Sequence, residues 1–194
     1  VAWAKAILFN DKMKEEFRSF FHRPDTLALG VCNGAQLFAH LAELIPGAEV
    51  WPSFERNRSE QFEGRLSMVE IVKSPSLLLR GMEGARLPIA VAHGEGRAVW
   101  NDPKRADAAL ASGLLAMRFI DGEGKAAKNY PANPNGSMGG ATAFTSRDGR
   151  VTIMMPHPER LVRSVQWSWK PDGWGENGPW SKLFENARHW IEEK

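Results

Sequence analysis

An apolar run passes directly into a cysteine flanked by glycines in the segment Leu27-Ala28-Leu29-Gly30-Val31-Cys32-Asn33-Gly34. A short, continuous apolar run is typical of a strand that is covered on both faces, as in the parallel sheets of α/β proteins. Helical spacing resumes over residues 35–44, and Pro46-Gly47 ends it. Cys32 is therefore predicted to lie in a tight turn between a buried strand and a helix, at the sheet edge where α/β proteins bind ligands.

The rest of the chain alternates between helical and strand patterns. Further helices are predicted over residues 11–23, 103–111 and 180–193. Further strands are predicted over residues 66–72, 89–92, 115–120 and 151–155. Residues 129–140 are dense in Asn, Pro and Gly and predict a long loop, whose length suggests a functional role. We expect an α/β fold, a three-layer sandwich with a mostly parallel central sheet, in one domain over residues 1–194.

The composition excludes several classes of protein. Twenty-five basic and 23 acidic residues leave a net charge of +2, which argues against a dedicated nucleic-acid-binding protein. No apolar run is long enough to cross a membrane, and Lys5, Asp11 and Lys12 interrupt any signal peptide. The single cysteine, Cys32, excludes an internal disulfide and a multi-cysteine metal site. We therefore expect a cytoplasmic protein without a bound metal.

The turn at Cys32 has the small-x-nucleophile-x-Gly form of a nucleophile elbow. The N-terminus of the following helix would favour the thiolate over the thiol. The backbone N–H of Asn33 would point toward an oxyanion formed at the sulfur. A buried structural cysteine is the alternative, but the strand, the glycines and the helix together favour a nucleophile.

A nucleophilic cysteine needs a base, and His157 is the best candidate. Pro156 and Pro158 hold it in an extended segment after a predicted strand, where residues two apart project to the same side. Glu159 can therefore orient the His157 ring as the third member of a Cys–His–acid triad. The histidines expected at the surface, on predicted helices, are His22, His40 and His189.

Other chemistries have weaker support. His93-Gly94-Glu95 and His157-Pro158-Glu159 match the His-x-Glu half of a zinc deaminase, but the cysteine pair is absent. A metal held by the two His/Glu pairs is an alternative. The sequence has no P-loop for phosphate binding.

These motifs resemble those of the class I (triad-type) glutamine amidotransferases. The resemblance is carried by Gly30-Val31-Cys32-Asn33-Gly34-Ala35-Gln36 and by Pro156-His157-Pro158-Glu159. Within the family, the C-terminal glutaminase domain of a large synthetase of purine biosynthesis has further similar segments. They are Trp3-Ala4-Lys5, residues 92–97, residues 129–137 and the Trp-rich tail. The resemblance covers essentially the whole chain and implies the flavodoxin-like class I glutaminase fold.

The resemblance also implies a reaction. Cys32 would attack the carboxamide of glutamine, His157 would protonate the leaving ammonia and then activate water, and Glu159 would orient His157. The residues implied beside the substrate are Asn33, Gln36 and His93. No cofactor is implied for this domain. ATP and Mg are implied for the synthetase domain of the same polypeptide, which uses the ammonia to convert formylglycinamide ribonucleotide to the amidine.

One departure from the family and three alternatives accompany this interpretation. Family members have strands and a glycine-rich loop ahead of the Trp3 segment, so we expect an N-terminally incomplete domain with an exposed sheet edge. Another Cys–His–Glu hydrolase, such as a γ-glutamyl hydrolase, is one alternative, and a non-catalytic interaction module is another. The tryptophans of residues 167–190 are expected to pack the tail onto the domain, with a docking surface for the synthetase as the alternative.

Overall fold

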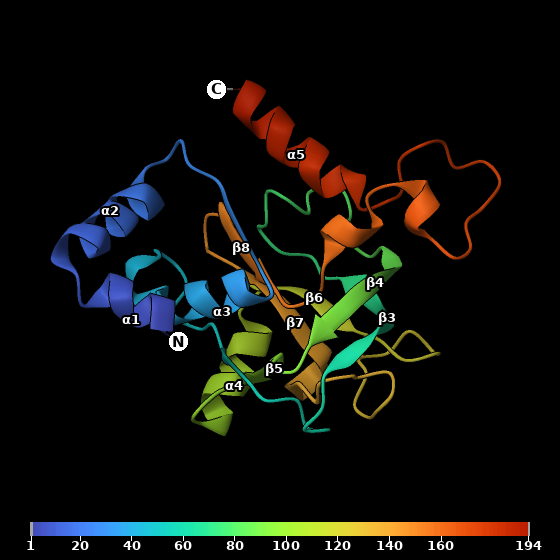
Figure 1. Ribbon diagram of the computed structural model, residues 1–194, viewed down its shortest axis with the longest axis horizontal. Coiled ribbons are helices and arrows are strands. Elements are labelled where there is room, and N and C mark those ends of the chain that lie inside the picture. The colour runs from blue at the N-terminus through green and yellow to red at the C-terminus, as the bar shows by residue number, and fades with distance from the viewer. Residues whose placement is uncertain (1, 194) are drawn as a thin grey trace.

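A curled six-stranded sheet forms the middle layer of the computed structural model, which describes residues 2–193 (Figure 1). The strands stand in the order β1-β8-β7-β6-β3-β4. Their bounds are β1 (Ala28–Val31), β3 (Glu63–Ile71), β4 (Arg86–His93), β6 (Leu115–Phe119), β7 (Ala141–Thr145) and β8 (Val151–Met154). A separate antiparallel ribbon joins β2 (Ser53–Glu55) and β5 (Arg97–Val99).

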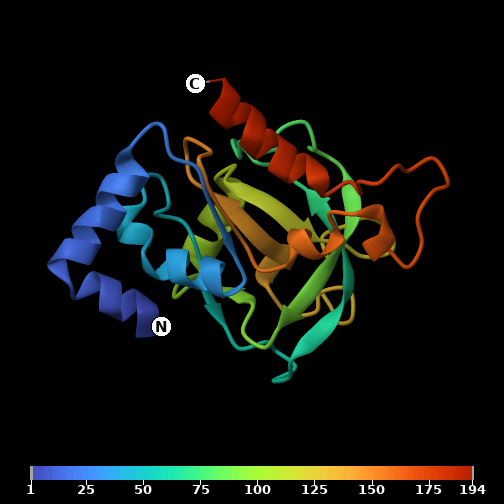
Figure 2. The same cartoon turned by 45° about the horizontal axis from the view of Figure 1, so that its top comes forward.

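Helices supply the outer layers. The longer ones are α1 (Ala2–Leu8), α2 (Asp11–His22), α3 (Asn33–His40), α4 (Pro103–Ala111) and α5 (Ser181–Glu192). Single 3₁₀ turns are η1 (Ala42–Leu44), η2 (Met138–Gly140), η3 (Pro158–Leu161) and η4 (Ser164–Gln166). One buried cluster joins α1, α2 and α3 to β1 and β8, and a second joins α5 to β3, β4 and β6. The two groups of helices therefore lie on different sides of the sheet (Figures 1 and 2).

The α/β class is confirmed, but the sheet is mixed rather than mostly parallel. β1 and β8 pair in parallel. The pairs β7–β8, β6–β7, β3–β6 and β3–β4 are antiparallel. The five residues between β7 and β8 include Asp148-Gly149, and antiparallel neighbours need only such a short turn, whereas parallel ones need a long crossover.

Most predicted elements are confirmed to within a few residues, but one helix and three strands were missed. The sequence did not predict α1, β2, β5 or β7. The last helix buries only the start of its apolar face, since Leu183 is 0% exposed whereas Ile191 is 64% exposed. Packing of the tail is confirmed for Trp180, which is fully buried and donates its ring N–H to the Pro88 carbonyl at 2.8 Å. Trp169, by contrast, is 78% exposed.

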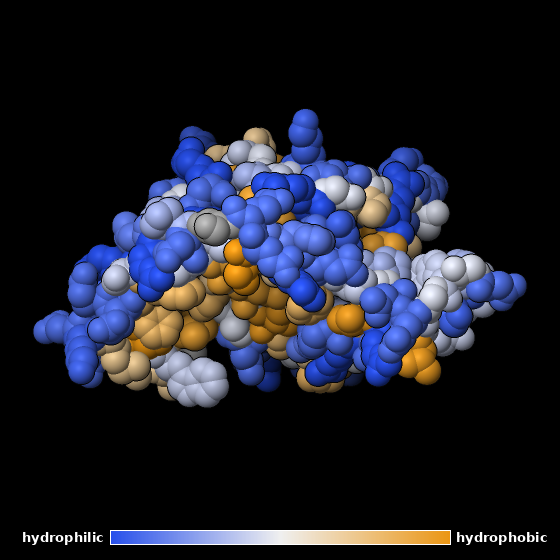
Figure 3. All heavy atoms as spheres, turned by 90° about the horizontal axis from the view of Figure 1, so that it is seen from above, coloured by the Kyte–Doolittle hydropathy of each residue, from blue (hydrophilic) through white to orange (hydrophobic). Residues whose placement is uncertain are grey.

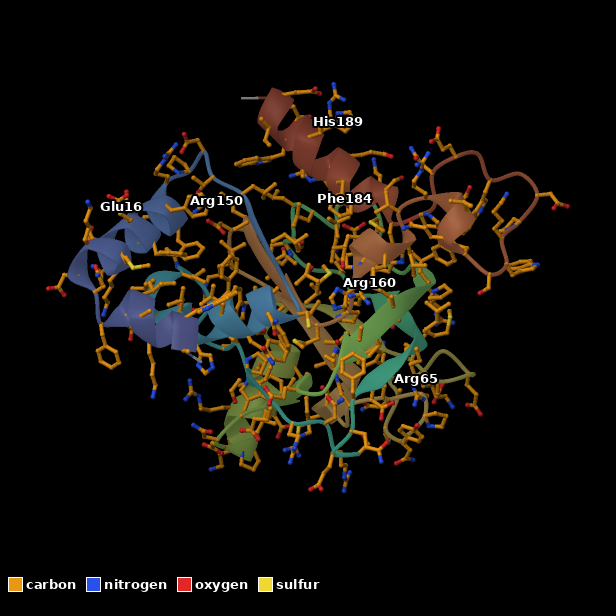
Figure 4. The ribbon with its side chains drawn as sticks, viewed as in Figure 1. Glu16, Arg65, Arg150, Arg160, Phe184 and His189 are labelled. Atoms are coloured by element: carbon orange, nitrogen blue, oxygen red, sulfur yellow. The ribbon has the colours of Figure 1, made fainter. Side chains whose placement is uncertain are left out.

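β1 lies at one end of the sheet and borders an apolar hollow. A cavity of about 530 Å³ is lined by side chains of α2, α3 and the β1 segment, including Phe17, Phe20 and Leu29. Figure 3 shows a broad group of hydrophobic side chains at the surface. Arg150 anchors the chain that enters β1, because its guanidinium donates to the Phe21 carbonyl at 3.0 Å (Figure 4).

Between residues 2 and 193, no helix has the length and apolar character needed to span a membrane.

Candidate active site

Cys32 occupies the sharp turn between β1 and α3. Its backbone has φ 52° and ψ −107°, a strained conformation for a residue with a side chain. The turn is held because the Cys32 N–H donates to the Met154 carbonyl at 2.9 Å. The turn also requires a glycine at position 30, because a Cβ on Gly30 would lie only 2.8 Å from the Gly34 carbonyl oxygen. The predicted strand–turn–helix junction is therefore confirmed.

The Cys32 thiol is half-buried beside a carbonyl. Its sulfur lies 3.9 Å from the Ala92 oxygen, which it can approach as an S–H donor. Burial raises the pKa of this thiol, while the Asn33 N–H and the charge of Arg160 lower it. Burial has the largest effect, so the resting sulfur favours the thiol. The expected preference for the thiolate is therefore not met in the resting site, although the Asn33 N–H acts in the expected direction.

His157 and Glu159 form the pair that the sequence predicted. The His157 Nδ1 lies 2.7 Å from the Glu159 Oε1. The His157 backbone N–H donates to the Ala90 carbonyl at 2.8 Å, which bridges the segment after β8 to β4. The His157 Nε2 is buried and has no hydrogen-bond partner among residues 2–193. This nitrogen is therefore available to exchange a proton with a bound molecule.

Cys32 and His157 line one cleft of about 790 Å³. The other lining residues are Val31, Asn33, Phe62, Gly64, Arg65, Leu66, Ala90, Val91, Ala92 and Arg160. Two positively charged residues of this cleft, Arg65 and Arg160, were not predicted from the sequence. Arg160 directly follows the acidic residue of the proposed triad and comes from η3 (Figure 4). Arg65 comes from β3, where it pairs with Glu63 at 2.5 Å and stacks 4.6 Å over the Tyr130 ring.

Gln36 and His93 are not among the residues that line this cleft. The Gln36 side-chain amide donates to the Glu95 carbonyl at 2.7 Å. His93 is 3% exposed, and its Nε2 lies 3.2 Å from the Asn135 Nδ2. Burial and the neighbouring His157 lower the pKa of His93 from 6.5 to about 4. Direct substrate contact by these two residues stays a prediction, and the position of His93 does not favour it.

The structure also shows where the three remaining histidines lie and whether the described residues include a group that could hold a metal. His22, His40 and His189 are exposed, as expected. In the described part of the chain, no group of three or more His, Cys, Asp or Glu side chains could hold a metal ion.

Comparisons with known proteins agree with this architecture. The sequence profile of the family described as CobB/CobQ-like glutamine amidotransferase domain matches residues 1–191. The structure of PurLQS from Thermotoga maritima has a TM-score of 0.58 and 22% sequence identity, over 85% of this chain and 62% of that chain. The structure of a putative GMP synthase component from Thermoplasma acidophilum has a TM-score of 0.50 and 11% identity, over 94% of this chain and 67% of that chain. This chain therefore spans less than two thirds of the PurLQS chain, and at these identities the likeness concerns the fold alone.

Proposed function

Because the chain belongs to the CobB/CobQ-like glutamine amidotransferase family, we propose that Cys32, His157 and Glu159 hydrolyse glutamine to glutamate and ammonia. The observation that carries this proposal is the meeting of two elements in one cleft. Cys32 projects from a strained elbow, and His157 faces the same cleft with its far nitrogen held by Glu159. A nucleophile, a base and an orienting carboxylate in this relation are the parts of a covalent hydrolase.

The first half-reaction forms a thioester. Since burial keeps the resting thiol protonated, His157 Nε2 takes the Sγ proton as the sulfur attacks the carboxamide carbon of glutamine. The carbonyl oxygen becomes an oxyanion, which the Asn33 N–H stabilises. The C–N bond then breaks, and His157 returns the proton to the leaving nitrogen, so that ammonia departs and a glutamyl thioester remains.

The second half-reaction restores the enzyme. His157 removes a proton from a water molecule, whose oxygen attacks the thioester carbon. The C–S bond breaks, glutamate leaves, and His157 gives the proton back to the Cys32 sulfur. Glu159 holds the Nδ1–H side of the ring throughout and stabilises the imidazolium that forms in each half.

We also propose that the ammonia is consumed by a synthetase domain of the same polypeptide. The motif resemblance favours phosphoribosylformylglycinamidine synthase, and the fold similarity to PurLQS is compatible with it. In that enzyme, the synthetase part would use ATP and Mg to activate the amide oxygen of formylglycinamide ribonucleotide, which ammonia then replaces. The setting would be the cytoplasm.

The test compares Cys32→Ala with His189→Ala, an exposed histidine, in the complete polypeptide. We expect Cys32→Ala to abolish glutamine-dependent synthesis and to leave ammonia-dependent synthesis intact, while His189→Ala changes neither. An electrophilic glutamine analogue should label Cys32, as mapped by peptide mass spectrometry, and excess glutamine should block the label. Unchanged glutamine hydrolysis in Cys32→Ala would overturn the proposal, and faster hydrolysis of γ-glutamyl peptides than of glutamine would favour a γ-glutamyl hydrolase.

A further inference from the structure

The His93 ring is buried next to the catalytic residues without belonging to them. His93 ends β4, and its Nε2 lies 3.2 Å from the Asn135 Nδ2. The Asn135 Oδ1 accepts the Ser137 backbone N–H at 3.1 Å, so the atom that faces His93 is the NH₂ group. An NH₂ group only donates, and His93 Nε2 must therefore be the acceptor. The imidazole is neutral and carries its proton on Nδ1.

A second buried asparagine, Asn57, also holds this turn. Asn57 is 1% exposed, its NH₂ group donates to the His93 carbonyl at 2.7 Å, and its Oδ1 accepts the Gly96 N–H at 3.0 Å. Asn135 completes the enclosure by donating to the Gly96 carbonyl at 2.8 Å. The ring lies so close to Gly96 that a Cβ there would come within 2.2 Å of it. The turn is therefore held by buried hydrogen bonds from two asparagines and by packing against Gly96, whereas the His93 Nδ1 has no hydrogen-bond partner among residues 2–193.

The strand that this turn terminates is the one that touches both catalytic residues. The Ala90 carbonyl accepts the His157 N–H at 2.8 Å, and the Ala92 carbonyl lies 3.9 Å from the Cys32 sulfur. His93 directly follows Ala92, and His157 is near enough for its charge to lower the pKa of His93. A displacement of the turn would therefore change the separation of Cys32 and His157.

We propose that neutral His93, held by Asn135 and Asn57, is a positioning residue that sets the geometry of Cys32 and His157 through the end of β4. The loop of residues 129–140 contributes to this positioning through Asn135. The inference rests on the proposed glutaminase function.

Asn133 provides a matched control for Asn135. Both are buried in the same loop, but the Asn133 amide donates to the Ala127 and Ser137 carbonyls and not to the His93 turn. In the complete polypeptide, we expect Asn135→Ala to lower the kcat of glutamine hydrolysis about tenfold or more with KM nearly unchanged, because misplacement of catalytic groups by about 1 Å can cost about a hundredfold. Asn133→Ala should lower Tm by a similar amount and leave kcat unchanged.

Variants of the ring test its role as an acceptor. His93→Gln can still offer an oxygen to Asn135, whereas His93→Leu cannot. We expect Gln to retain more of the wild-type kcat than Leu does, in samples whose circular dichroism shows a folded protein. Equal kcat for the two variants, together with equal kcat for Asn135→Ala and Asn133→Ala, would overturn the proposal.

A readout without glutamine separates this inference from the function on which it rests. The rate of Cys32 alkylation by iodoacetamide, measured against pH, reports the sulfur and its neighbours whether or not the protein hydrolyses glutamine. We expect Asn135→Ala to shift the midpoint of this profile and Asn133→Ala to leave it in place. If Cys32→Ala does not alter glutamine hydrolysis, the proposed function fails. An identical profile in wild type and Asn135→Ala would instead refute the positioning role.

Discussion

The carbonyl groups of Ala90 and Ala92 face the same edge of β4, where one accepts the backbone N–H of His157 at 2.8 Å and the other lies 3.9 Å from the sulfur of Cys32. Carbonyls two residues apart on a strand point to the same side, so the spacing of β4 determines how these groups are spaced. Cys32 follows β1 and Ala92 belongs to β4, which are the two ends of the strand order. The sheet therefore curls until its ends meet at the site.

The first prediction concerns the reactivity of Cys32. Burial raises the pKa of the thiol, Arg160 lowers it and Glu159 raises it. We expect wild-type alkylation by iodoacetamide to have a midpoint above that of an ordinary thiol. Arg160→Gln should move the midpoint to higher pH and Glu159→Gln to lower pH. Arg163→Gln, a change at an exposed arginine nearby, is the control and should have no effect. Shifts of the same sign for Arg160→Gln and Glu159→Gln would contradict this electrostatic account.

The second prediction uses two glycines of the elbow. A Cβ at Gly30 would lie 2.8 Å from the Gly34 oxygen and 3.0 Å from the Phe38 ring, whereas a Cβ at Gly34 meets nothing within 4 Å. Gly30→Ala should lower the free energy of unfolding by about 1–3 kcal/mol through overpacking. Gly34→Ala lies within α3 and should be neutral or stabilising by about 0.5–1 kcal/mol. Urea unfolding measures both, and equal midpoints for the two variants would show that the elbow tolerates a side chain at Gly30.

The third prediction concerns stability against acid. The pKa of His93 falls from 6.5 to about 4 on folding, so between these values the unfolded chain binds one proton more than the native protein. The free energy of unfolding therefore rises with pH across this window and falls as the pH drops through it. The loss on acidification is about 3 kcal/mol if the protein stays folded to pH 4.

Replacing His93 by Leu should remove this contribution, whereas His22→Leu, at an exposed position, should retain it. The measurement is urea unfolding at pH 7 and pH 4.5. A similar pH dependence in wild type and His93→Leu would mean that His93 does not cause it.

The fourth prediction compares two tryptophans of the tail. Trp180 is fully buried and hydrogen-bonded to Pro88, whereas Trp169 is 78% exposed. Trp180→Ala should lower the free energy of unfolding by about 3–5 kcal/mol. Trp169→Ala should change it by less than about 0.5 kcal/mol. A large loss for Trp169→Ala in the isolated chain would indicate that the exposed part of the tail also supports the fold.

The features that could be predicted from the sequence are those encoded within a few residues. The elbow at Cys32 follows from an apolar strand, close glycines and a helix in direct succession. The pairing of His157 with Glu159 follows from the prolines that flank His157. In both cases, the residues that determine the geometry are neighbours in the chain, so local rules are sufficient.

Other features depend on contacts between distant residues. The hydrogen bonds of His93 join it to Asn57 and Asn135, which lie 36 and 42 positions away, so no local pattern indicates them. The placement of His93 beside the substrate rests on the family resemblance and stays a prediction. The antiparallel pairing of the strands could not be predicted for a different reason. β7 is only five residues long and wholly buried, without the alternation that marks a half-exposed strand, so its hairpin with β8 went unrecognised.

The bridge between Ala90 and His157 has a consequence for the motions of the protein. It joins β4, at one end of the sheet, to the continuation of β8, the neighbour of the strand at the other end, so the curled strands are linked through His157, the proposed base. If the hydrogen bond between the His157 N–H and the Ala90 carbonyl opened locally, the curled sheet would widen. The same event would move His157 away from Cys32. Opening of the sheet and displacement of His157 from Cys32 would then require the same free energy. The hydrogen-exchange rate of the His157 backbone amide would measure that free energy.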